Sequence, residues 1–197
     1  VSKIDGATGD VTVNPETTFS AKGQERLICP GMNGGKNFQA GAYSPMTNAM
    51  YFGLENACID MTTSEDHTTA YAFTSKMRLS PNMDKAGSLF AISAETGKTL
   101  WRYDQPAGMM SSLATGGGLI FAGDSVGRFR AFDHETGKIL WETDLGSEIT
   151  GYPITYSVNG KQYVAVSTGN SLVSGAINTM MNLKATRTNA LYVFALP

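Results

Sequence analysis

Two cysteines, Cys29 and Cys58, are the first residues whose chemistry bears on function. Two sulfurs are too few for a four-sulfur zinc site, and the two lie too far apart for a redox Cys-x-x-Cys motif. Two interpretations remain open at this point: a buried pair of free thiols, or a disulfide, which indicates an oxidising compartment. The histidines His67 and His134 are far apart in the sequence, and we expect neither a metal site nor a catalytic triad from them.

Carboxylates are the other candidates for proton-transfer chemistry. Asp5, Asp124, Asp133 and Asp144 lie in predicted turns or at the ends of repeated segments. In such places the default role of a carboxylate is to be solvated and to cap a turn. We therefore assign no catalytic residue and no metal ligand to this chain.

Composition narrows the classes of function. The chain has 197 residues, of which 42% are hydrophobic and 16% charged, with a formal net charge of -2. This balance provides no basic surface for nucleic acid, and no stretch approaches the roughly 18 to 20 apolar residues of a membrane span. Length alone predicts one complete domain, and the 22 glycines are typical of many strands and tight turns.

An internal repeat changes the expectation of a complete domain. Residues 127–144 repeat residues 87–104 at an offset of 40, with nine of eighteen positions identical, and both copies contain Glu-Thr-Gly-Lys and a later Trp. A third, degenerate copy at residues 3–13 keeps Asp5, Thr8 and Gly9 but lacks the Trp. A period near 40 residues is typical of β-propeller blades.

Each repeat is predicted to form a β-hairpin. Segments 89–93 and 129–133 are expected strands, Gly97 and Gly137 allow the turn, and Trp101 and Trp141 begin the partner strands. Further strands are expected at 117–124, 153–158 and 161–169, which gives four strands per period. We expect each Trp to pack between neighbouring blades beside a small Ala, and we expect no helix.

Two longer segments interrupt this pattern. Residues 14–86 contain both cysteines; 40–45 and 48–56 are predicted strands and 64–87 an irregular excursion. Residues 171–188 form a second predicted excursion, after which 189–197 are expected to end in a strand. Loops on a rigid scaffold often carry binding sites, so both are candidates.

At this point the sequence resembles a known family. The blocks ICPGMNGGKNFQAGAYSP, NACIDM, MMSSLATGGGLIFAGDSVGRFRAFD and GYPITYSVNGKQYVAVSTG occur in the order found in the C-terminal part of pyrroloquinoline quinone (PQQ) dependent alcohol and methanol dehydrogenases. The resemblance spans nearly the whole chain. It implies an all-β fold, an eight-bladed β-propeller of which this chain supplies about three C-terminal blades. It also implies PQQ beside a calcium or lanthanide ion.

The resemblance assigns roles to residues near the cysteines. It implies a Cys29–Cys58 disulfide, and it matches Asn37 to an amide that orients the quinone, the alternative being a turn Asn beside two glycines. Phe38 stands where many relatives have Trp, with core packing as the alternative. Lys36 is expected to be a solvated loop lysine, although a cofactor carboxylate is a second possible partner.

Met109 and Met110 fall where relatives place a Trp-Gly or similar dipeptide against PQQ. A backbone contact with PQQ would be retained with methionine at these positions, whereas a contact made by the indole would be lost. The alternative is that the two methionines only pack against their neighbours. The 171–188 segment lacks the aromatic residues found near the active-site mouth of relatives, and we interpret it as a face loop near the substrate entrance.

The family's catalytic Asp, metal ligands and vicinal Cys-Cys ring have no match here. We therefore expect residues 1–197 to be one portion of a periplasmic propeller dehydrogenase that oxidises alcohols to aldehydes or ketones. The sequence starts at Val1 and contains no haem-attachment motif, and we expect no C-terminal cytochrome segment. The implied partners are the N-terminal propeller portion, a small alcohol and a separate cytochrome or other electron acceptor. The competing hypothesis is a non-catalytic propeller scaffold that binds proteins.

Overall fold

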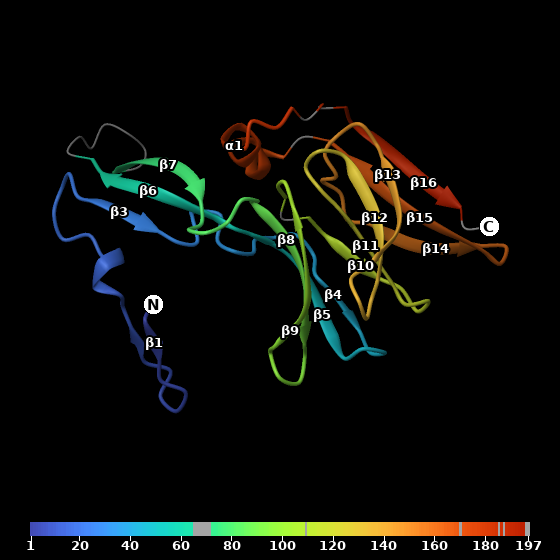
Figure 1. Cartoon of the computed structure of the whole chain (residues 1–197), viewed down its shortest axis with the longest axis horizontal. Helices are drawn as coiled ribbons and strands as arrows, with labels where there is room; N and C mark the ends of the chain where they lie inside the picture. The colour runs from blue at the N-terminus through green and yellow to red at the C-terminus, as the bar shows by residue number, and fades with distance from the viewer. Residues whose placement is uncertain (65–71, 109, 170, 185, 187, 196–197) are drawn as a thin grey trace.

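The computed structural model describes residues 1–64, 72–108, 110–169, 171–184, 186 and 188–195 (Figure 1). The described part consists mainly of antiparallel strands, which confirms the all-β prediction. His67 and Met109 lie outside the described residues. In the described part, no helix is long and apolar enough to cross a membrane.

Two four-stranded sheets form the centre of the fold. The first has the order β4-β5-β8-β9 and the second the order β10-β11-β12-β13. Their strands are β4 (Ala42–Ser44), β5 (Ala49–Glu55), β8 (Gly87–Ser93), β9 (Thr99–Gln105), β10 (Ser112–Ala114), β11 (Leu119–Gly123), β12 (Arg128–Asp133) and β13 (Ile139–Asp144). The predicted four strands per period are therefore confirmed.

Smaller sheets flank this centre. A three-stranded sheet contains β14 (Ile154–Val158), β15 (Lys161–Thr168) and β16 (Ala190–Ala195). A second three-stranded sheet contains β3 (Glu25–Ile28), β6 (Ala57–Thr63) and β7 (Phe73–Leu79), and an N-terminal hairpin contains β1 (Lys3–Ile4) and β2 (Val11–Thr12). A short 3-10 helix (Pro15–Thr17) and α1 (Leu172–Met180) complete the described elements.

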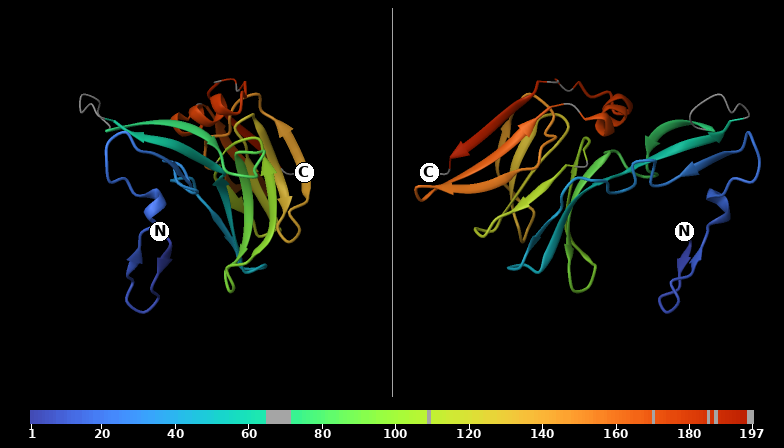
Figure 2. Two further views of the ribbon diagram at one scale, coloured as in Figure 1. Left: turned by 60° about the vertical axis from the view of Figure 1, so that its left-hand side comes forward. Right: turned by 180° about the vertical axis from the view of Figure 1, so that it is seen from behind.

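The core lies between successive sheets because alternate side chains of a strand point to opposite faces. Ile120 and Ala122 of β11 pack with Tyr51 and Leu89 of the first sheet. The residue between them, Phe121, points to the other face and packs with Val164 of β15. The second sheet thus contributes to two cores, one shared with the first sheet and one shared with the sheet of β14, β15 and β16, and Figure 2 shows these three sheets stacked in series.

Trp101 joins the two four-stranded sheets. It pairs with Ala91 across the β8–β9 ladder, and its Nε1 donates a hydrogen bond of 3.0 Å to the carbonyl of His134, in the turn after β12 of the next sheet. Its ring covers Gly137, where a Cβ atom would lie 2.6 Å from the indole. The prediction that this Trp packs between blades is confirmed, and the glycine of the repeat is required by close approach as well as by its φ of +70°.

The degenerate N-terminal repeat adopts the turn of the intact copy. Asp5 Oδ1 accepts hydrogen bonds from the backbone N–H groups of Ala7 and Thr8, as Asp133 Oδ1 does from residues 135 and 136. In the fifth position, Gly9 has a φ of +79°. The turn chemistry of the motif is therefore retained although the Trp has been lost.

Two predictions about secondary structure are wrong. Segment 64–87 is not irregular throughout, because residues 73–79 form β7, paired with β6 along its whole length. Residues 172–180 form α1, although no helix was expected. The helix is short and contains Gly175, so its local signal is weak, and it is held by tertiary packing: Ile177 is buried against Ala86 and Ala107.

The expectation of a solvated carboxylate is wrong for Asp124. Its side chain is fully buried and lies 2.8 Å from Arg130 Nη1, while its other oxygen accepts the N–H groups of Val126 and Arg128. Burial disfavours the Arg130 cation, but the hydrogen bond and charge of Asp124 outweigh it and raise the pKa of Arg130. Asp144, by contrast, is exposed.

Candidate functional site

The predicted disulfide is present and anchors one loop. Cys29 and Cys58 are bonded to each other, and Cys58 is fully buried in β6. Residues 31–40 follow directly and are here called the glycine loop. Gly31 donates its N–H to the carbonyl of Ala57 and Glu55 donates its N–H to the carbonyl of Gly35, each at 2.8 Å. The loop is thus held against the connection between β5 and β6.

The disulfide has a direct chemical test. We expect thiol titration of the unreduced, denatured chain to find no free thiol, because its only two cysteines are bonded to each other. After reduction the same titration should find two. Two thiols before reduction would contradict the pairing and the inference of an oxidising compartment.

The three glycine-loop residues named from the sequence have distinct environments. Asn37 is exposed; its Nδ2 donates to the carbonyl of Asn33 at 3.0 Å and its Oδ1 accepts the N–H of Phe38 at 2.8 Å. The Phe38 side chain is 59% exposed, which excludes core packing within this chain. Lys36 is not the expected solvated lysine, because its Nζ binds the carbonyls of Asn37 and Gln39 and burial lowers its pKa.

The second predicted segment lies against the glycine loop. Ala40 donates its N–H to Ser111 Oγ at 3.1 Å, and Ser112 donates its N–H to the carbonyl of Ala40 at 3.0 Å. Met110 is buried, with its side chain against Gly108. The structure therefore brings together two segments about 70 residues apart in the sequence, one with Asn37 and Phe38 and the other with Met110.

Sequence reasoning missed two residues that shape this region. Gln105 is buried and its Nε2 donates to the carbonyls of Gly108 and Gly123, which fixes the turn before Met110. Glu55 ends β5 with 5% exposure, and burial raises its pKa to about 7 against the opposing effect of the Asn33 hydrogen bond. A polar residue at the end of a strand of alternating buried residues was the available signal for Glu55, whereas the strand that Gln105 ends has no such alternation.

The donor chemistry of this region suits a flat organic ligand better than a metal ion. No group of three His, Cys, Asp or Glu side chains suitable for a metal occurs in the part of the chain that the structure describes. Asn37 retains one of its two amide hydrogens after bonding Asn33, and the Phe38 ring offers an exposed aromatic face. An orienting donor and an aromatic face fit a planar ring system that carries carbonyl oxygens.

Comparison with known proteins identifies the class of scaffold. Residues 105–164 match the family of glucose/ethanol/alcohol dehydrogenase β-propeller domains named PQQ. The chain is 35% identical over 187 residues to the dehydrogenase subunit of a quinone alcohol dehydrogenase from Acetobacter aceti, with 84% of this chain and 24% of that protein covered. The chain resembles part of a PQQ-dependent alcohol dehydrogenase.

Two further relatives support the same class. A lanthanide-dependent methanol dehydrogenase from Methylacidiphilum fumariolicum is 37% identical over 150 residues, with 72% of this chain and 24% of that protein covered. The structure of a europium-containing methanol dehydrogenase superposes with a TM-score of 0.77 at 30% identity, covering 89% of this chain and 36% of that one. The fold is thus that of a PQQ-type propeller, and the chain spans about a quarter of the length of these curated relatives.

Proposed function

We propose that this chain forms one wall of the PQQ site in a quinoprotein that oxidises alcohols to aldehydes or ketones. The observation that carries the proposal is the contact between the glycine loop and residues 110–112, made through Ala40 and Ser111. This contact supports the proposal because Asn37 and Phe38 belong to the glycine loop and Met110 belongs to the segment that the loop meets. The alcohol dehydrogenase relatives give this arrangement its chemical context.

PQQ, when bound, supplies the hydride acceptor for the oxidation of the alcohol. In this proposal the free amide hydrogen of Asn37 orients a ring carbonyl, and the amide itself does not titrate. Phe38 provides an apolar face to the ring, and the Met109–Met110 segment provides backbone contact. Lys36 holds the loop closed through the carbonyls of Asn37 and Gln39.

The base that receives the alcohol proton and the ligands of a calcium or lanthanide ion would lie in the remaining blades. The lanthanide in the name of one relative favours such an ion beside the site. Residues 171–188, which include α1, would contribute to the substrate entrance. The Cys29–Cys58 disulfide supports a periplasmic location, and a separate cytochrome or other acceptor would remove the electrons.

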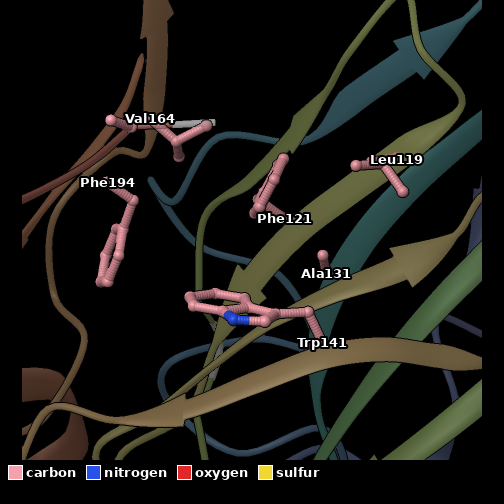
Figure 3. A pocket seen from close by; sticks show the side chains of 7 residues that line it. Leu119, Phe121, Ala131, Trp141, Val164 and Phe194 are labelled. Carbon is pink, nitrogen blue, oxygen red and sulfur yellow. The ribbon is translucent and has the colours of Figure 1, made fainter. Parts of the chain in front are cut away.

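The sheet of β14, β15 and β16 supports the proposal that this chain acts together with the rest of the propeller. It contains three strands where the two preceding sheets contain four, and within the described residues no strand pairs with the outer edge of β16. Trp141 is the counterpart of Trp101, yet it is 39% exposed and lines an apolar cavity of about 410 Å³ with Phe121, Val164 and Phe194 (Figure 3). An additional strand on β16 would cover this cavity as the second sheet covers Trp101.

Replacing Asn37 by alanine tests the proposal. In the full-length protein that contains this chain, we expect N37A to weaken PQQ binding about tenfold, because one hydrogen bond to a desolvated ring oxygen is lost. The measurements are PQQ titration of the apoprotein and alcohol-dependent dye reduction with calcium or a lanthanide present.

The matched control removes an amide far from the site. Gln162 lies on the exposed β14–β15 hairpin, where its Nε2 bonds Thr155, and Q162A should bind PQQ as the wild type does. If N37A and Q162A have equal PQQ affinity, Asn37 has no part in the site. If the wild type neither binds PQQ nor reduces dye with any of several alcohols, the function itself is wrong.

A further inference from the structure

Glu55 is buried directly behind the glycine loop. It is the last residue of β5, and its backbone N–H holds Gly35 while the adjoining Ala57 carbonyl holds Gly31. Its side-chain Oε2 accepts a hydrogen bond of 3.5 Å from Asn33 Nδ2. The loop is therefore attached to this short stretch through backbone contacts and through one carboxyl group.

The same carboxyl is connected to Asn37 in two steps. Asn33, which bonds Glu55 through its side chain, accepts the Asn37 amide at its backbone carbonyl at 3.0 Å. A shift of Asn33 would remove the partner that fixes the Asn37 side chain. The orientation of Asn37 thus depends on Glu55, which is buried and does not belong to the exposed surface of the loop.

The surroundings of Glu55 favour its neutral form. Its Oε1 is buried and has no hydrogen-bond partner among the described residues. The cations on neighbouring segments are directed elsewhere: Lys36 binds loop carbonyls, and Lys85 binds the carbonyl of Asp104, whose carboxylate pairs with Arg102. An ionised Glu55 would therefore be a buried charge with one neutral donor, Asn33, and without a compensating cation among the described residues.

From this geometry we propose that Glu55 is a positioning residue that, in its protonated form, holds the glycine loop and through Asn33 sets the orientation of Asn37. This inference rests on the proposed function for its link to PQQ. Its link to the loop is independent of PQQ. Glu55 itself touches no reacting atom in this proposal.

The direction of the pH dependence follows from the raised pKa. Burial raises the pKa of Glu55 from 4.5 to about 7, whereas a carboxyl released to solvent by loop opening titrates near 4.5. The stabilisation of the closed loop is therefore complete below about pH 4.5, falls as the pH rises to about 7, and is constant above that value. The closed loop and PQQ binding should both be favoured by mild acid.

Two substitutions in the full-length apoprotein separate the carboxyl's roles. E55Q keeps an acceptor for Asn33 and cannot ionise, whereas E55A removes the contact. Hydrogen exchange should show amides 31–37 exchanging about tenfold faster in E55A and at the wild-type rate in E55Q at pH 5.5. E95Q removes a charge from an exposed turn of the same sheet and serves as the control, with no expected change.

PQQ titration supplies the second readout. From pH 5.5 to 8 we expect wild-type and E95Q affinity for PQQ to fall about tenfold more than that of E55Q, whose affinity should change little by comparison. Should E55A fail to fold, E55Q still decides the matter. Equal exchange of amides 31–37 in E55A and wild type, or an E55Q affinity with the full wild-type pH dependence, would overturn the inference. Absence of PQQ binding by the wild type would instead overturn the proposed function and leave the exchange result to decide the anchoring role.

Discussion

Trp101→Ala is expected to lower the free energy of unfolding by about 3–5 kcal/mol, which is the usual cost of truncating a well-packed aromatic side chain. The indole lies between two sheets, against Tyr51, Phe132 and Gly137, and donates a hydrogen bond to the carbonyl of His134. Removal of the indole would leave a cavity between the two sheets. Denaturant unfolding of the full-length protein measures the effect.

Trp101→Phe is the matched control for this substitution. It retains an aromatic ring but loses the N–H donor, and the His134 carbonyl still accepts the Tyr51 hydroxyl at 2.9 Å. A cost of about 1 kcal/mol is expected. If Trp101→Ala costs no more than Trp101→Phe, the ring does not hold the two sheets together and the inter-blade interpretation of the repeat is wrong.

Asp124→Ala is the second large effect, with an expected loss of about 3–5 kcal/mol in the free energy of unfolding. The substitution leaves Arg130 buried beside Glu142 alone and removes the acceptor for the N–H groups of Val126 and Arg128. Arg130 also lies over the Tyr103 ring of the preceding sheet, at 5.3 Å. The substitution would therefore weaken the same contact between the two four-stranded sheets that Trp101 makes.

Two variants sharpen this second prediction. Asp144→Ala removes an exposed carboxylate that lies 3.7 Å from Arg128, and it should cost less than about 1 kcal/mol. Asp124→Ala combined with Arg130→Met should recover part of the loss, since no unpaired charge remains. If Asp124→Ala and Asp144→Ala have equal effects on unfolding, Asp124 does not have the buried structural role that its geometry indicates.

Much of the fold could be predicted from local patterns. The 40-residue repeat, the alternation around Ala91 and Ala131, and the Asn159-Gly160 turn all correspond to strands and hairpins in the structure. These features are local because a hairpin is specified by its turn residues and by the two-residue period of its strands. The family resemblance added the cysteine pairing, which the residues alone left undecided.

What could not be predicted depends on contacts distant in sequence. Strand β7 exists because it pairs with β6, and α1 exists because Ile177 is buried between Ala86 and Ala107. Asp124 has the sequence context of a turn residue, and only the buried Arg130 in the adjoining strand gives it a different environment. Tertiary burial overrides local propensity in each case.

The candidate site also contains residues that the sequence could name and residues that it could not. The sequence motifs name Asn37, Phe38 and Met110 as candidates, and the structure brings their segments together through Ala40 and Ser111. Glu55 and Gln105 carry no motif, so their importance follows only from burial and from the backbone groups that they hold. Residues that support a site from behind are identified by structure and seldom by sequence.

The most direct test of the central claim is a crystal structure of the full-length protein loaded with PQQ. We expect the PQQ ring to lie within hydrogen-bond distance of the Asn37 amide and against the Phe38 ring, and a fourth strand to pair with the outer edge of β16. A bound PQQ remote from the glycine loop, or a glycine loop that faces bulk solvent beside an empty axis, would contradict the account.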